Sequence, residues 1–493
     1  MINNLLKIPF IQYSVFTEIF LIISSLVLLV FGVCKGDKET KKIAILATTI
    51  LLVAIFAVLY SNNAINNPFV EYYRVDIFTT VIKLLIISSA IISLLLYIGH
   101  LNYNTHNSRF EYGIIILLSV IGMLVLVSAK DFLTLYMGIE LQSLALYILA
   151  ALNKGNLKST EAGFKYFVLG ALSSAILLYG ISLIYGFTGS LSFQVIAANL
   201  LEIGTGHLGI IVALVLIVIA LCFKVSAVPF HMWTPDVYEG SPTPVTTFLA
   251  TTPKIAAFTI LFRVLSEAFP LYYVDWSNIL ALVAVASLVV GSLGAIIQQN
   301  FKRLLAFSSI NHVGFLLLGI LVNNNLGMQA VLIYIFIYVS LVFGAFAFLM
   351  IVKQAHHTVD SADKRSLENI NSFAGLAKAM PLSAIGMVII LLSMSGLPPF
   401  AGFFGKFSIF QAALDSPFYF IAIIAAISAV ISAFYYIKII KVMFFDDLTD
   451  NYNKKATFLT KLIFTIMVLF NFLFFIKADF IFKLTDNVVE YLF

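Results

Sequence analysis

Long apolar runs recur along almost the whole chain and are separated by short polar connections. A helix that crosses the hydrocarbon core of a bilayer needs roughly 20 apolar residues, and the runs have about that length. The pattern predicts fourteen spanning segments: 14–33, 42–60, 76–99, 112–129, 131–152, 161–187, 207–240, 244–265, 276–298, 303–321, 328–352, 381–415, 417–445 and 457–477. No soluble domain fits between them, so the predicted fold class is an all-α polytopic membrane protein.

Prolines interrupt the seventh and twelfth segments, at Pro229 and at Pro398-Pro399. A bilayer tolerates broken backbone only where protein or a water-filled cavity satisfies its polar groups. The two breaks therefore indicate an ion path, as in a pump or transporter. The proline-rich stretch 229–245 that follows the first break is predicted to be a rigid loop and not a long helix.

The chain also repeats itself across these breaks. Ser226-Ala-Val-Pro-Phe is similar to Ser395-Gly-Leu-Pro-Pro-Phe, and a weaker match sets 135–146 against 304–315. Segments 4–8 and 9–13 thus form two units of five helices, and an odd number implies opposite orientations in the membrane. The domain boundaries predicted from this repeat are 1–111 for three N-terminal helices, 112–265 and 276–446 for the repeats, and 447–493 for a last helix and tail.

Composition agrees with the membrane class: 61% of the 493 residues are hydrophobic and 11% are charged, against about a quarter charged in soluble chains. The net charge of +5 is spread over the connections, which indicates no nucleic-acid partner. Basic residues gather in the odd-numbered connections, whereas the even-numbered ones hold only Arg74 and Lys130. By the positive-inside rule the odd connections face the cytoplasm, and both termini face the periplasmic side of a bacterial inner membrane. The odd-side residues counted were Lys35, Lys38, Lys41, Lys42, Arg109, Lys154, Lys158, Lys302, Arg303, Lys353, Lys364, Arg365, Lys378, Lys454 and Lys455.

The chain carries none of the usual signatures of a redox cofactor. It has two cysteines, Cys34 and Cys222, and no CxxC, phosphate loop or dinucleotide fingerprint. We therefore expect no cofactor and no metal in this chain, and any redox chemistry would belong to partner subunits.

Four ionisable residues are predicted at membrane depth, where each costs several kcal/mol unless it is solvated or paired. They are Glu140 in segment 5, Lys224 before the first break, Lys254 in segment 8 and Lys406 after the second break. A carboxylate that moves toward or away from a lysine in a semi-dry cavity controls whether the lysine keeps its proton. Glu140 and Lys224 are predicted to form such a switch, with Lys254 and Lys406 further along the path.

Structural roles compete with this interpretation. The lysines could snorkel to an interface or form packing ion pairs. His312 and His231 are further candidates for proton relay, but each could instead hydrogen-bond a backbone carbonyl. Asp236 and Glu239 could gather protons at the cytoplasmic mouth, while capping or turn formation is the alternative role.

Several quoted runs resemble one known family. They are the run from Lys224 through Pro229-Phe-His-Met-Trp-Thr-Pro-Asp-Val-Tyr, the Met-Gly-Ile-Glu-Leu-Gln-Ser-Leu context of Glu140, the run from Lys302 to His312, and Gly396-Leu-Pro-Pro-Phe-Ala-Gly-Phe-Phe-Gly-Lys406. Together they are similar to the antiporter-like membrane subunits of respiratory complex I, NADH-quinone oxidoreductase. The resemblance extends from the first segment to the last.

The resemblance implies a proton-translocating membrane-arm subunit beside other antiporter-like subunits in the lipid bilayer. It further implies that NAD, FMN, iron–sulfur clusters and quinone are held by partner subunits. Glu140 and Lys224 match the family's switch, Lys254 its central lysine and Lys406 its outlet lysine. A subunit of a multi-subunit Na⁺/H⁺ antiporter or of a membrane-bound hydrogenase remains an alternative, and a solute transporter and a structural scaffold rank below these.

Overall fold

The computed structural model describes residues 15–61, 71–101, 109–153, 155–355, 367–448, 452 and 456–490. Within these ranges, thirteen helices are long and apolar enough to cross a membrane, and one further predicted segment is split by a break. The predicted all-α membrane fold is confirmed. Among the basic residues of the topology count, Lys154, Lys364, Arg365, Lys454 and Lys455 lie outside the described residues.

The helices follow the predicted order closely. The first half contains α2 (Phe16–Lys35), α3 (Thr40–Ser61), α4 (Ile77–Leu101), α5 (Glu111–Ser128), α6 (Phe132–Ala150), α7 (Leu157–Thr188), α8 (Phe193–Ile203), α9 (Leu208–Val225), α10 (Trp233–Gly240) and α11 (Thr243–Arg263). The second half contains α12 (Tyr273–Ile296), α13 (Phe301–Val322), α14 (Asn325–Ala355), α16 (Leu376–Ala379), α17 (Pro381–Ser395), α18 (Ala401–Leu414), α19 (Tyr419–Phe445), α20 (Phe458–Leu473) and α21 (Ala478–Val489). The pattern missed the short helix α8 and the final helix α21.

Both predicted breaks are present. Helix α9 ends at Val225, where Ser226 takes a left-handed conformation with φ of 67°, and helix α17 ends before Gly396 with φ of 87°. The chain resumes as helices α10 and α18. The predicted rigid loop after Pro229 therefore contains a helix of eight residues. Pro235 is compatible with α10 because it lies in the first turn, where a backbone N–H has no partner within the helix.

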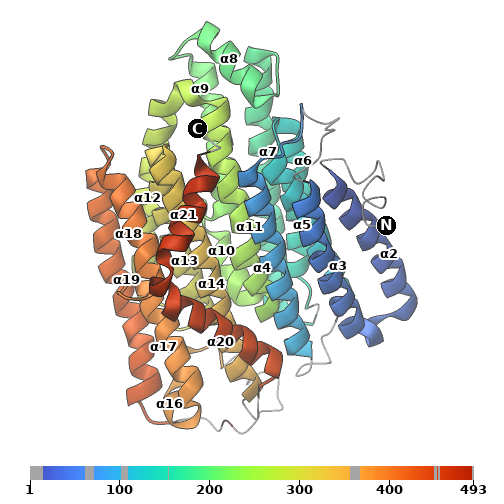
Figure 1. Ribbon diagram of the computed structural model, residues 1–493, viewed down its shortest axis with the longest axis vertical. Helices are drawn as coiled ribbons and strands as arrows, with labels where there is room; N and C mark the ends of the chain where they lie inside the picture. Colours follow the sequence, from blue (N-terminus) through green and yellow to red (C-terminus); the bar gives the residue numbers. More distant parts are fainter. Residues whose placement is uncertain are drawn as a thin grey trace.

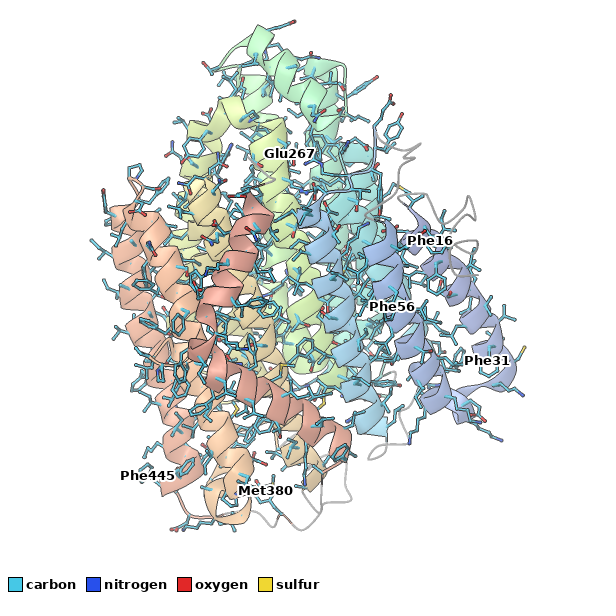
Figure 2. The ribbon with its side chains drawn as sticks, in the orientation of Figure 1. Phe16, Phe31, Phe56, Glu267, Met380 and Phe445 are labelled. Atoms are coloured by element: carbon cyan, nitrogen blue, oxygen red, sulfur yellow. The ribbon has the colours of Figure 1, made fainter. Side chains whose placement is uncertain are left out.

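Helices α11, α13 and α14 form the centre of the bundle (Figure 1). We compared how much of an apolar stretch of 18 residues is buried in each spanning helix. The share is 100% for the span that contains α11, 94% for α13 and α14, and only 33% for α2 at the N-terminal edge. The outer helices turn apolar side chains away from the bundle, as Phe56 and Phe445 do in Figure 2 with 72% and 81% exposure. An apolar outer surface around a polar-containing centre is the arrangement that a bilayer favours.

The predicted repeat has a counterpart in how helix pairs pack. Helices α5 and α6 meet where Gly122 lies against the backbone of Gln142, and helices α12 and α13 meet where Gly291 lies against the backbone of Asn311. Gly291 follows Gly122, and Asn311 follows Gln142, by the same number of residues that separates 304–315 from 135–146. Small residues allow this close approach of backbones inside membranes. The two halves therefore use the same contact to position α6 and α13, which carry candidate site residues.

Candidate proton path

Glu140 and Lys224 come from neighbouring parts of the first repeat. Helix α6 begins at the N-cap Asp131, whose side chain accepts hydrogen bonds from the backbone N–H groups of Leu133 and Thr134. Lys224 lies in the last turn of α9 and donates a 2.9 Å hydrogen bond to the hydroxyl of Ser143, one turn beyond Glu140 on α6. Residues three apart share a helix face. The two groups are therefore held on the same side of α6.

Glu140 and Lys224 are near each other without a direct contact. The hydrogen bond to Ser143 places Lys224 one helical turn from Glu140, but none of the ion pairs among the described residues joins them. One carboxylate oxygen of Glu140 is buried and has no hydrogen-bond partner. A buried acceptor without a partner is costly, so this carboxylate is poised to gain one when the lysine or a water moves.

Lys254 lies in the most buried helix and is 4% exposed. Its ammonium group donates to the hydroxyl of Ser309 on α13 and lies 5.7 Å from the ring centre of Tyr338 on α14. The hydroxyls of Ser309 and Tyr338 are 2.8 Å apart. Helices α9 and α11 pack together, although no hydrogen bond among the described residues joins Lys224 to Lys254. A proton that passes between these two lysines needs water.

His312 on α13 lies between Lys254 and Lys406. Its Nδ1 atom is 2.7 Å from the hydroxyl of Tyr334, and its Nε2 atom is 3.4 Å from that of Tyr436. The histidine lines two small cavities of about 10 Å³ each, one shared with Ser309 and Tyr338, the other with Lys406. A cavity needs roughly 10–15 Å³ to hold one water.

Lys406 lies in the first turns of α18, directly after the second break, and is 4% exposed. Its ammonium group donates a 2.9 Å hydrogen bond to the backbone carbonyl of Ser395 and lies 5.1 Å from the ring centre of Phe315. That carbonyl belongs to the last residue of α17, which the break leaves without its helical partner. The break thus supplies the oxygen that holds the lysine.

The remaining candidates lie apart from this chain of contacts. His231 is buried after the first break, and among the described residues no hydrogen bond joins its ring to the other candidates. Asp236 pairs with Lys165 and Arg303, and Glu239 pairs with Lys158 and Arg303. These two carboxylates thus form an ion-pair network at the end of the bundle that is predicted to face the cytoplasm.

Sequence reasoning missed the hydroxyl groups that link the charged residues, namely Ser143, Ser309, Tyr334, Tyr338 and Tyr436. Serine and tyrosine are frequent in this chain, so residue type alone does not single them out. One signal was available: Ser309 occupies the position in 304–315 that Glu140 occupies in 135–146.

Two sequence comparisons show what the chain is similar to, and a search of the side chains addresses metal binding. Residues 129–432 match the family described as NADH:quinone oxidoreductase/Mrp antiporter, TM. The NADH-quinone oxidoreductase subunit N of Paramagnetospirillum magneticum is 44% identical over 89% of each chain. No group of three His, Cys, Asp or Glu side chains that could hold a metal ion occurs in the described ranges.

Solved structures agree with these relatives. A chain of respiratory complex I from Thermus thermophilus, with bound aureothin, is 31% identical with a TM-score of 0.77, covering 94% of this chain and 98% of that one. A chain of the Mrp complex from Dietzia has a TM-score of 0.81 over 97% and 96%, but at 19% identity it shares the fold alone. Because the match to subunit N is close and spans nearly the whole length, the chain belongs to the subunit N group of the NADH-quinone oxidoreductase and Mrp antiporter membrane family.

Proposed function

We propose that this subunit of NADH-quinone oxidoreductase moves protons through Glu140, Lys224, Lys254, His312 and Lys406. The observation that carries the proposal is the position of His312, which lines the cavities on both the Lys254 side and the Lys406 side. Imidazole has two nitrogens, so it can accept a proton at one and donate a proton at the other. This position supports a continuous relay in the second half of the path.

The first half of the path acts as a switch. Quinone reduction in partner subunits changes the charge along the membrane axis, and Glu140 then approaches or leaves Lys224. The proton of Lys224 is stabilised when the carboxylate is near and is released toward water and Lys254 when it is not. The free carboxylate oxygen of Glu140 and the hydrogen bond from Lys224 to Ser143 support this step, because the lysine has a second partner available.

The proposal also covers the cofactors, the neighbouring subunits and the orientation in the membrane. NAD, FMN, iron–sulfur clusters and quinone belong to partner subunits, and other antiporter-like subunits are the lateral neighbours. Protons enter from the cytoplasmic side and leave past Lys406, with both termini on the periplasmic side of the bacterial inner membrane. The charge distribution of the connections supports this orientation.

Lys406→Ala tests the proposal. The intact complex would be purified, reconstituted in vesicles and followed by NADH-driven acidification with and without a sodium gradient. Removing the ammonium group deletes a proton carrier, so acidification should fall by about tenfold or more while the complex stays assembled. Lys483→Ala is the matched control, because this lysine is exposed on α21 and pairs with Asp479 one turn away on the same helix.

Two results would contradict the proposal. Full acidification by Lys406→Ala would remove Lys406 from the path. A strict requirement for sodium would favour the alternative function, a subunit of a multi-subunit Na⁺/H⁺ antiporter with the same fold.

A further inference from the structure

Two buried charged residues, Lys302 and Glu368, and the partly buried Lys353 lie together near the start of α13, outside the path described above. Lys302 in α13 and Lys353 in α14 both point to one carboxylate oxygen of Glu368, at 2.9 Å and 2.6 Å. Lys302 is 2% exposed and Glu368 is 8% exposed. The sequence pattern had assigned Lys302 to a cytoplasmic connection. It is instead buried, because Glu368 and the carbonyl of Ser241 at 2.8 Å satisfy its ammonium group.

With both lysines protonated and Glu368 ionised, the cluster carries one net positive charge. Burial opposes ionisation of Glu368, but Lys302 and Lys353 prevail and lower the pKa of Glu368 to about 2. The carboxylate therefore stays ionised at any physiological pH. Two ammonium groups against one carboxylate leave one buried positive charge, which is costly in a low-dielectric site. The cluster can remove this cost by giving up a proton, and only a lysine can release it.

The cluster lies between the predicted cytoplasmic surface and the central cavity. Lys302 is 3.5 Å from the backbone carbonyl of Glu239, whose side chain belongs to the surface ion-pair network. In the other direction, Ser309 follows Lys302 by two turns of α13, roughly 10 Å along the axis. Tyr238 of α10 and Leu305 of α13 line the cavity that contains Ser309.

We propose that Lys302, which shares the carboxylate of Glu368 with Lys353, is a proton-binding site that takes up protons on the cytoplasmic side and supplies Lys254. The proposal rests on the proposed function, because it needs Lys254 to accept the proton. The charged groups that face Lys302 are Glu368, Lys353 and Glu239. Lys302 carries the proton, and Glu368 and Lys353 are positioning residues that set how tightly it is held.

Anchoring the polypeptide is the competing role for these residues. The backbone carbonyl of Glu368 accepts a 2.7 Å hydrogen bond from the N–H of Phe301, and Ile370 donates to the carbonyl of Gln299. Because these bonds are between backbone groups, a change of side chain leaves them intact. Side-chain variants can therefore separate anchoring from proton transfer.

Lys302→Arg is the decisive variant. Arginine keeps the charge and the pairing with Glu368, but it does not release its proton at physiological pH. In vesicles containing the intact complex, NADH-driven acidification should fall by about tenfold or more, while assembly is unchanged. Lys378→Arg is the control, because this lysine is exposed and pairs with Asp447 at the same end of the bundle. Wild-type acidification by Lys302→Arg would overturn the proposal, since anchoring alone would be preserved.

Lys353→Met provides a second measurement if Lys302→Arg fails to assemble. Removing the neighbouring cation should let Lys302 hold its proton to a higher pH, so the alkaline limb of the acidification rate should shift to higher cytoplasmic-side pH. A purely anchoring cluster would leave the limb in place, and an unshifted limb overturns the proposal. If the proposed function itself is wrong, Lys406→Ala will pump protons normally, and this result distinguishes that case. A defective Lys406→Ala beside a normal Lys302→Arg would refute the Lys302 site alone.

Discussion

At the scale of single residues, the charged groups of the proposed path contact neutral hydroxyl and carbonyl groups. Lys224, Lys254 and Lys406 each donate a hydrogen bond to a serine. The acceptor is the side-chain hydroxyl for Lys224 and Lys254, and the backbone carbonyl oxygen for Lys406. Such neutral partners satisfy an ammonium group without fixing a compensating charge beside it. A lysine paired in this way can lose its proton without leaving an unpaired carboxylate behind.

His312→Gln tests the second half of the path. Glutamine keeps hydrogen-bonding capacity toward Tyr334 and Tyr436 but cannot carry a proton, so NADH-driven acidification should fall by about tenfold. His207→Gln is the control, because His207 is exposed and its ring meets the ring of Phe187 edge to face, away from the candidate site. Equal acidification by the two variants would show that protons pass from Lys254 to Lys406 without the imidazole.

At the scale of helices, the breaks and the close contacts were predictable to different degrees. Pro229 and Pro398 marked where α9 and α17 end, because proline removes a backbone donor and excludes the preceding turn. The glycines at the contacts gave no such signal, since a glycine in an apolar helix has several uses. Only the packed structure distinguishes Gly291, which lies against α13, from Gly186, which has open space beside it.

Gly291→Ala tests the contact between α12 and α13. An added Cβ would overlap the backbone of Asn311, and overpacking of this kind costs about 1–3 kcal/mol. The melting temperature of the purified complex should therefore fall. Gly186→Ala should leave it unchanged or slightly raised, because alanine favours helix over glycine. Equal melting temperatures of Gly291→Ala and the wild type would mean that the helices separate freely at this point.

At the scale of the whole molecule, the three most buried helices carry most of the path. Lys254 lies on α11, His312 and Ser309 on α13, and Tyr338 on α14, so lipid does not reach these groups. The outer helices supply the apolar surface that the bilayer and neighbouring subunits cover. At the end of the bundle that is predicted to face the cytoplasm, Glu368 joins α13 to α14 through two lysines, and Lys353 also donates to Thr243 at the start of α11.

Glu368→Gln tests how strongly this cluster stabilises the fold. The pKa of Glu368 falls from an ordinary value of 4.5 to about 2, a difference that corresponds to about 3 kcal/mol. Because the folded pKa is the lower one, this stabilisation is present above pH 4.5 and is lost as the pH falls toward 2. The variant should melt at a lower temperature than the wild type at pH 7, and the gap should narrow in acid. A gap that stays constant with pH would exclude the charge as its cause.

The sequence by itself determined the membrane class, the positions of the spans, the two breaks and the presence of Glu140, Lys224, Lys254 and Lys406 at membrane depth. These features depend on local properties, namely hydrophobic length, proline chemistry and the position of a charge within an apolar run. Only the tertiary structure decided the partners. Lys224 meets a serine 81 residues away, His312 meets Tyr436 across 124 residues, and Lys302 is buried by Glu368. Contacts between residues so distant in sequence depend on how the helices pack, which no local pattern encodes.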